Sequence, residues 1–206
     1  MNGGVSKAAR EFELGRGTSL LIILIGIISL SADAQSPSPD KSTTSGSESL
    51  LPRKVVIPIS IVNRFFPEVS REASTGRNLT AVANSKATRS VIYANSDSSK
   101  KVTITVDQYA SSSEASSAYQ EAVAKSKTVP GFKPVSAENL GPNAFVGNVT
   151  QGGETHIGLG ALHGTLIVGV TLAGYDSTPD KIANLISLTR EEENAVKTAL
   201  DAIPKE

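Results

Sequence analysis

The sequence predicts a single α+β domain in which a largely antiparallel five-stranded sheet packs with helices. Three observations support this fold class. Segments of alternating apolar and polar residues are separated by short glycine-containing turns, which is typical of antiparallel hairpins. Start signals for helices occur before, between and after these segments. From residue 52 to residue 206 the expected order is therefore helix, two strands, helix, three strands, helix.

The N-terminus begins with basic residues that precede a short apolar run. This run, from Leu20 to Leu30, is eleven residues long, and small residues follow it as far as Ala34. A membrane-spanning helix needs about 20 apolar residues, and this run falls well short of that length. We therefore predict a secretory signal peptide over residues 1–34, with an uncleaved anchor helix as the alternative. After cleavage the protein is expected to be secreted or periplasmic and to have no membrane span.

The next seventeen residues, 35–51, are rich in serine and proline. They contain six Ser, two Thr and two Pro. Such a segment buries too little apolar surface to offset the entropy lost on ordering. We predict a disordered linker here, followed by the folded domain over residues 52–206.

The first part of the domain contains a short helix and two strands. Prolines bound a helix within residues 57–67. Residues 68–86 carry little periodicity and are expected to form a loop. Residues 87–94 and 102–110 are rich in β-branched residues and predict two strands joined by a polar turn.

Two further helices have clear start signals. Ser111 and Glu114 have the spacing of a capping box, which predicts a helix over residues 112–127. Thr178 and Pro179 predict the start of the C-terminal helix. The acidic run within residues 190–194 interrupts the apolar stripe of that helix, so one long helix and two helices with a kink fit equally well. We expect Glu191, Glu192 and Glu193 to lie on a solvated face.

Three strands, over residues 143–150, 156–162 and 165–172, lie between these helices. Gly152-Gly153 and His163-Gly164 separate them and predict tight two-residue turns, which fix the register. On this register Val146, Leu159 and Val168 form one cross-strand row on the core face.

The opposite face of these strands is the candidate ligand-binding surface. The predicted register aligns three glycines on it, so that bare backbone forms a trough. In one interpretation the C-terminal helix crosses the glycines at short distance, which is common in small α+β domains. In the other interpretation the trough is a shallow ligand groove, with Phe145 and His156 on its walls. The candidate ligand-binding residues are Phe145, Gly147, His156, Gly158, Gly169 and Thr171.

Composition excludes several classes of function. The chain has 20 basic and 20 acidic residues, so it offers no overall charge for nucleic-acid binding. It has no cysteine, which excludes disulfides, thiolate metal sites and cysteine nucleophiles. We find no sequence motif of a serine hydrolase, a zinc protease or a nucleotide-binding protein, and we expect no cofactor and no metal.

Charge is unevenly distributed along the domain. Residues 52–101 hold nine Lys or Arg against three acids, whereas residues 102–206 hold seven against twelve. We expect the two parts to pack together and cancel. The alternative is a basic patch facing an anionic polymer or lipid head group.

These observations favour an exported, non-catalytic binding or interaction domain. Its partner is expected to be a small molecule, a cell-surface component or a protein. The alternative is a small secreted hydrolase centred on His156, with Thr171 as the cross-strand neighbour and with Glu154 or Asp176 as the acid.

The order of elements over residues 52–206 resembles that of the small extracytoplasmic domains of bacterial sensors and lipoproteins, including some of PsbP-like fold. This resemblance implies an extracytoplasmic domain, in agreement with the predicted signal peptide. It lies in the order of elements, and it assigns no site residue.

Overall fold

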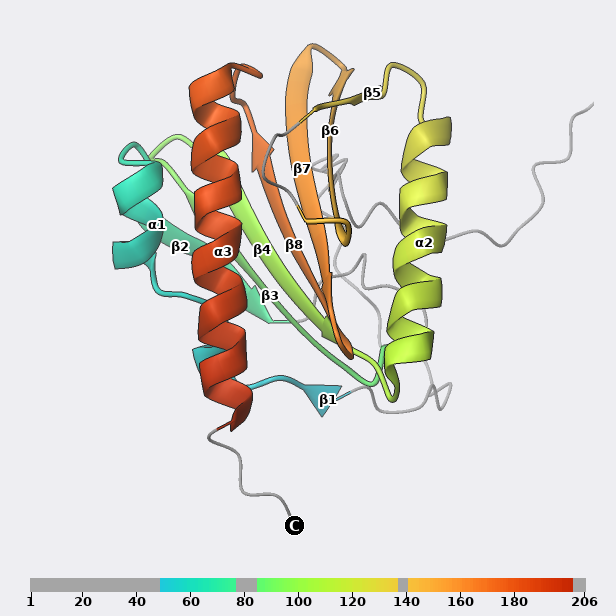
Figure 1. The fold of residues 1–206 in the computed structure, drawn as a ribbon. Coiled ribbons are helices and arrows are strands. Elements are labelled where there is room, and N and C mark those ends of the chain that lie inside the picture. Colours follow the sequence, from blue (N-terminus) through green and yellow to red (C-terminus); the bar gives the residue numbers. More distant parts are fainter. Residues whose placement is uncertain (1–48, 77–84, 137–140, 202–206) are drawn as a thin grey trace, which may run out of the picture.

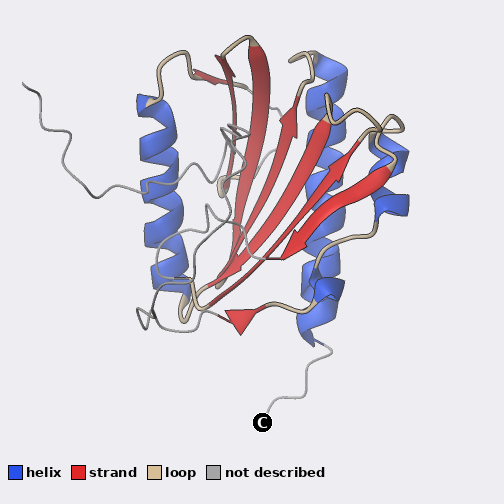
Figure 2. Ribbon diagram, turned by 180° about the vertical axis from the view of Figure 1, so that it is seen from behind, coloured by secondary structure: helices blue, strands red, loops and turns tan. Residues whose placement is uncertain are grey.

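The computed structural model describes residues 49–76, 85–136 and 141–201, which form one sheet with helices on both faces (Figures 1 and 2). The strands are β1 (Ser49–Leu50), β2 (Arg71–Gly76), β3 (Ala87–Ala94), β4 (Lys101–Gln108), β5 (Lys133–Pro134), β6 (Ala144–Gln151), β7 (Glu154–His163) and β8 (Leu166–Ala173). The helices are the 3₁₀ helix η1 (Arg53–Val55), α1 (Ile59–Phe65), α2 (Ser112–Thr128) and α3 (Pro179–Asp201).

The sheet has the strand order β1-β3-β4-β8-β7-β6-β5, and β2 pairs with β3 beside β1. All pairs are antiparallel except the short β1–β3 pair. Helix α3 lies across one face, in front of the sheet in Figure 1 and behind it in Figure 2. Helix α2 packs on the other face, where Ala115 and Tyr119 contact Ile167 of β8. The predicted α+β class with an antiparallel sheet agrees with this architecture.

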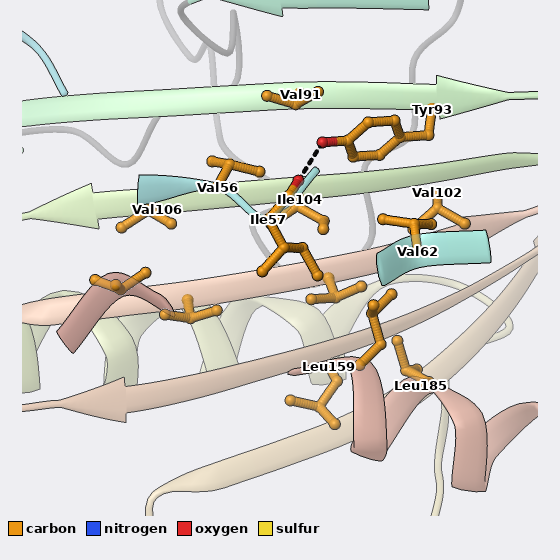
Figure 3. Packing of buried hydrophobic residues seen from close by; sticks show 14 of the residues in the cluster. Val56, Ile57, Val62, Val91, Tyr93, Val102, Ile104, Val106, Leu159 and Leu185 are labelled. Carbon is orange, nitrogen blue, oxygen red and sulfur yellow. Dashed lines mark hydrogen bonds between the residues drawn. The ribbon is translucent and has the colours of Figure 1, made fainter. Parts of the chain in front are cut away.

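The main core lies between the sheet and α3. Val146, Leu159 and Val168, the predicted core residues, are 2%, 1% and 1% exposed. Leu185 and Leu188 of α3 are fully buried in the same cluster, to which residues of η1 and α1 also belong. Figure 3 labels Leu159 and Leu185 within this cluster. Burial of a leucine of this kind contributes about 1.5–3 kcal/mol, so this cluster is the main source of stability.

The five predicted strands correspond to β3, β4, β6, β7 and β8, and three more strands join them. The largest of these, β2, lies where we expected a loop, so that expectation was wrong. The side chains of residues 71–75 are all exposed at the edge of the sheet, so the strand shows no alternation of apolar residues. Its backbone pairing with β3 holds it in place, and a bulge between Glu72 and Ser74 interrupts that pairing.

The folded region begins slightly before the expected boundary at residue 52. Strand β1 pairs with Ala87 and Thr88 of β3, and the backbone N–H of Leu51 donates to the Thr88 carbonyl at 3.1 Å. Leu51 is also only 4% exposed. The last three residues of the expected linker therefore belong to the domain. Residues 1–48, with the predicted signal peptide, lie outside the described residues.

Helices α2 and α3 begin where the capping residues in the sequence predict. The Ser111 hydroxyl accepts from the Glu114 backbone N–H at 3.2 Å and caps α2. Helix α3 runs unbroken through the acidic run, which decides between one helix and two. The expectation of a solvated acidic face was wrong for Glu192, which is 0% exposed. This residue faces the backbone of Ile57, whose N–H donates to its carboxyl group at 2.9 Å.

The first hairpin has the predicted register, but the second is shifted by two residues. Gly152 and Gly153 both have positive φ, as in a type I′ turn, and the β6–β7 pairing follows from it. In the second turn Gly164 has φ of 60° and is the first central residue, as in a type II′ turn. The turn is thus Gly164-Thr165, not His163-Gly164.

This shift changes which residues lie opposite each other and leaves the two faces unchanged, because side chains alternate with period two. Leu159 pairs with Val170, and Ala161 with Val168. Gly158 pairs with Thr171, whereas Gly169 pairs with Gly160. The predicted single row of Gly147, Gly158 and Gly169 is therefore incorrect.

Candidate functional site

The sheet face that α2 covers, here called the α2 face, carries all six predicted ligand-binding residues. On β6, β7 and β8 its glycines form two neighbouring rows. Gly158 lies between Gly147 and Thr171, and the next row contains Phe145, Gly160 and Gly169. His156 lies in the third row, between Val149 and Ala173.

Helix α2, and not the C-terminal helix, packs on this face, which corrects one of our two interpretations. The buried side of α2 carries the small residues Ala115, Ala122 and Ser126, together with Tyr119. Small residues let a helix approach a glycine-rich sheet closely. The Tyr119 hydroxyl donates to the Gly160 carbonyl at 3.4 Å, so the contact reaches the bare backbone. The longer apolar side chains of α3 fill the opposite face instead.

One end of the α2 face is occupied by Phe132, in the segment that follows α2. A Cβ atom on Gly147 would lie 2.2 Å from the Phe132 ring, so the absence of a side chain makes room for this ring. Phe132 stacks on Phe145 with ring centroids 5.7 Å apart, and Val149 packs in the same cluster. Phe145 and Gly147 are thus engaged in packing.

The unusual group on this face is the imidazole of His156, which is 6% exposed. Its Nε2 lies 3.5 Å from Oε2 of Glu154, whereas its Nδ1 is buried and has no hydrogen-bond partner within the described residues. Burial lowers the pKa of His156, and Lys101 adds to this effect while Glu154 opposes it. In a neutral ring that carries its proton on Nε2, this N–H faces Glu154 and Nδ1 is an acceptor.

Bare backbone and hydroxyl groups adjoin this imidazole. Gly158 follows on the same face of β7, and Thr171, 7% exposed, lies opposite it on β8. Thr171 in turn pairs with Thr103 of β4. In the neighbouring row Thr105 lies opposite Ser90, with their hydroxyl oxygens 3.3 Å apart. The imidazole and the Thr171 hydroxyl can between them both donate and accept hydrogen bonds.

The sequence alone did not place the hydroxyl groups of β3 and β4 on the same sheet face as His156 and Thr171. The alternation in strand 102–110 does put Thr103 and Thr105 on one face. Their position next to Thr171 depends on the pairing of β4 with β8, which are separated by more than 50 residues in the chain. No local signal specifies that pairing.

The neighbours of His156 differ from those expected for a hydrolase. His156 lies opposite Ala173, so Thr171 is not its direct cross-strand neighbour, and that expectation was wrong. Glu154 does approach the imidazole, through Nε2. Asp176 lines a hollow with Glu154 at the tips of the hairpins.

The described residues contain no cluster of three or more His, Cys, Asp or Glu that could hold a metal ion. Within the same residues, no helix is both long and apolar enough to cross a membrane.

The basic residues of the first part of the domain are tied into the local structure. Arg53 forms an ion pair with Glu72 at 2.6 Å. Arg71 donates to the Ser98 hydroxyl, and Arg89 donates to the Leu51 carbonyl, both at 2.6 Å. The Arg53–Glu72 pair lies within residues 52–101, and Arg71 and Arg89 donate to neutral oxygens, so these contacts do not decide between compensation by residues 102–206 and a basic patch.

Comparison with known proteins identifies a similar fold and no family. No family model matches the chain, and no curated protein matches it. The extracellular domain of PknH from Mycobacterium tuberculosis has a TM-score of 0.52 at 13% identity, covering 68% of this chain and 93% of that chain. LpqN, described as involved in cell envelope biogenesis of Mycobacterium tuberculosis, has a TM-score of 0.31 at 15% identity, covering 63% and 79%. The likeness to the PknH domain confirms the α+β fold class.

Proposed function

We propose that this protein is an exported, non-catalytic binding domain that holds a hydroxyl-bearing small ligand, free or part of a cell-surface component, on the α2 face. The site consists of His156, Gly158 and Thr171. The observation that carries the proposal is the buried Nδ1 of His156, which lacks a hydrogen-bond partner within the described residues. The predicted signal peptide supports export, as does the similar fold of an extracellular domain.

The chemistry of the site selects the ligand. A buried acceptor without a donor costs about 1–3 kcal/mol, and a ligand that donates an O–H to His156 Nδ1 recovers this cost. Gly158 brings no side chain, so a ligand ring can lie against the backbone. Thr171 can both donate and accept, as the neighbouring hydroxyl groups of a polyol or sugar require.

A test uses the ¹⁵N-labelled chain over residues 35–206 and NMR titration with glycerol, myo-inositol, glucose, galactose and mannose. We expect at least one of these to shift the His156 Nδ1 resonance and the Gly158 amide. His156→Leu, which removes the acceptor, should abolish the response. His163→Gln, which changes the other histidine of the chain, should leave it unchanged. If none of the five compounds moves either resonance, the proposed ligand class is wrong.

Gly158→Val tests the same site by adding a side chain where the proposal requires bare backbone. A β-branched residue suits a strand, but its side chain would occupy the position beside Thr171 that the proposal assigns to the ligand. We expect the variant to fold and to lose the response to the ligand. Loss of folding would instead assign Gly158 to packing beneath the segments that cover this face.

A secreted hydrolase is the second candidate, because Glu154 lies 3.5 Å from His156. A hydrolase needs a nucleophile on the free side of the imidazole, next to Nδ1. Hydrolysis of nitrophenyl esters that disappears in His156→Leu and persists in His163→Gln would favour this candidate over simple binding.

A further inference from the structure

We infer that a second pocket, on the opposite side of the sheet from His156, binds a small zwitterion with an apolar side chain, such as a free aliphatic amino acid. The pocket lies where the ends of β6 and β7 meet α3 and has a volume of about 230 Å³. It does not share a residue with the site on the α2 face, so it is argued independently of the proposed function.

The floor of the pocket is apolar. It is formed by Leu159 and Ala161 of β7, which are 1% and 4% exposed, together with Ala144 and the half-buried Ile186. A cavity of about 150 Å³ lined by such residues accepts benzene. The volume here therefore suits a branched aliphatic side chain and the charged groups attached to it.

The rim carries both signs of charge. Arg190 and Glu193 stand three residues apart on α3, so they are neighbours on one side of the helix, and both line the pocket. Arg190 already interacts within the chain, but a guanidinium has more N–H donors than one partner uses and can also donate to a carboxylate. Glu193 provides the matching acceptor for an ammonium group.

This pairing of charges argues against simpler ligands. A plain carboxylate would be attracted by Arg190 and repelled by Glu193, and a plain amine would meet the reverse situation. A zwitterion satisfies both groups at once. On the other side of the opening, Asn143 and His163 add polar groups. The backbone there is held in place because the Leu162 N–H donates to the Asn143 carbonyl at 2.8 Å.

Thr189 adds a further polar group to the wall of the pocket. Thr189 lines it with a buried side chain, and the Thr189 hydroxyl donates to the Leu185 carbonyl at 2.8 Å. This bond directs the hydroxyl proton away from a ligand and leaves an oxygen lone pair as a further acceptor for an ammonium group.

The experiment titrates the ¹⁵N-labelled chain over residues 35–206 with L-leucine, L-valine, N-acetyl-L-leucine and L-leucinamide. We expect the free amino acids to shift the amides of Ala161 and Ile186. The acetylated compound lacks the ammonium group and the amide lacks the carboxylate, so each should bind about tenfold or more weakly. Absence of any shift with the free amino acids, or binding of either blocked compound as tight as that of L-leucine, would refute the inference.

Variants locate the contacts. Arg190→Gln and Glu193→Gln should each weaken L-leucine binding about tenfold, because each removes one charged partner. Lys197→Gln lies on an exposed part of the same helix, outside the pocket, and should leave binding unchanged. The thermal melts of all three variants should match that of the unmodified chain. If Arg190→Gln and Glu193→Gln bind L-leucine normally, the pocket is not its site.

Discussion

At the scale of single residues, Glu192 shows how a buried carboxyl group can organise a segment distant in the chain. Its Oε2 accepts the N–H of Ile57, while its Oε1 has no partner within the described residues. The Ile57 carbonyl accepts the Tyr93 hydroxyl, to which Arg53 donates at 2.8 Å. Arg53 also donates to the Val56 carbonyl at 2.7 Å. One polar network thus fastens residues 53–57 between α3 and the sheet.

Burial raises the pKa of Glu192 to about 8, so this carboxyl group is mostly protonated at neutral pH. In the unfolded chain its pKa is near 4.5, and between these two values the folded state binds more protons. The free energy of unfolding must therefore fall as pH rises from about 4.5 to about 8, on the order of several kcal/mol for this group.

We expect Glu192→Gln to remove this dependence. The amide keeps an oxygen for the Ile57 N–H and carries no charge at any pH, so the variant should gain stability relative to the unmodified chain as pH rises. Urea unfolding at pH 5, 6.5 and 8 measures the change. Glu191→Gln, on the same turn of the helix and partly exposed, is the control and should retain the original slope. Equal slopes in all three proteins would show that Glu192 is ionised in the folded state.

At the scale of elements, the contact between the segment after α2 and strand β6 depends on one glycine. Phe132 lies over Gly147, where an added Cβ would meet its ring at 2.2 Å and the Lys133 carbonyl oxygen at 3.3 Å. The ring can swing aside, but it would then lose its stacking on Phe145.

Gly147→Ala should therefore lower the free energy of unfolding by about 1–3 kcal/mol, the usual cost of overpacking. The effect should shrink when Phe132 is already replaced by Ala, because the two positions then no longer compete for space. Chemical denaturation of the two single variants and the double variant measures this coupling. Gly141→Ala is the control, since nothing lies within 4 Å of its added Cβ. Additive effects of Gly147→Ala and Phe132→Ala would contradict the proposed contact.

The strands and helices with internal periodicity were predictable from the sequence, whereas edges and turns were not. Strand β2 has no buried side chains to mark it, and the second hairpin turn begins one residue later than predicted, at Gly164. A shift of one residue in a turn moves the pairing by two, so the predicted faces were correct while the predicted row was not. The same shift made one predicted contact of the candidate site wrong, because Thr171 lies opposite Gly158 and not opposite His156.

At the scale of the whole molecule, the two faces of the sheet differ in polarity. The face toward α3 is apolar and carries the main core, whereas the α2 face buries hydroxyl groups, a carboxyl group and an imidazole. Asp107, 1% exposed, accepts from the Thr88 hydroxyl at 2.6 Å on that second face. The sequence could not assign α2 to this face, because the choice depends on how two helices divide two faces after the sheet has formed. Buried polar groups need hydrogen-bond partners of specific geometry, whereas buried apolar groups contribute stability without such partners.

The N-terminus of the exported protein can be predicted from the residues that precede the domain. The described domain begins at Ser49, so residues 35–48 separate it from the predicted cleavage position. Ala32 and Ala34 provide the small residues that signal peptidases require before the cut. We therefore expect the exported protein to begin at Gln35, which mass spectrometry of the protein from its native host would detect.

Ala34→Arg should block this cleavage, because a large charged residue replaces a small one next to the cut. The chain should then accumulate in the membrane fraction with residues 1–34 attached. Ser36→Arg, beyond the cleavage position, should be processed normally. An unmodified chain that retains Met1 and stays in the membrane fraction would contradict the prediction. In that case the apolar run is an anchor, and the Ser/Pro-rich segment is a tether that presents both proposed binding sites at a membrane surface.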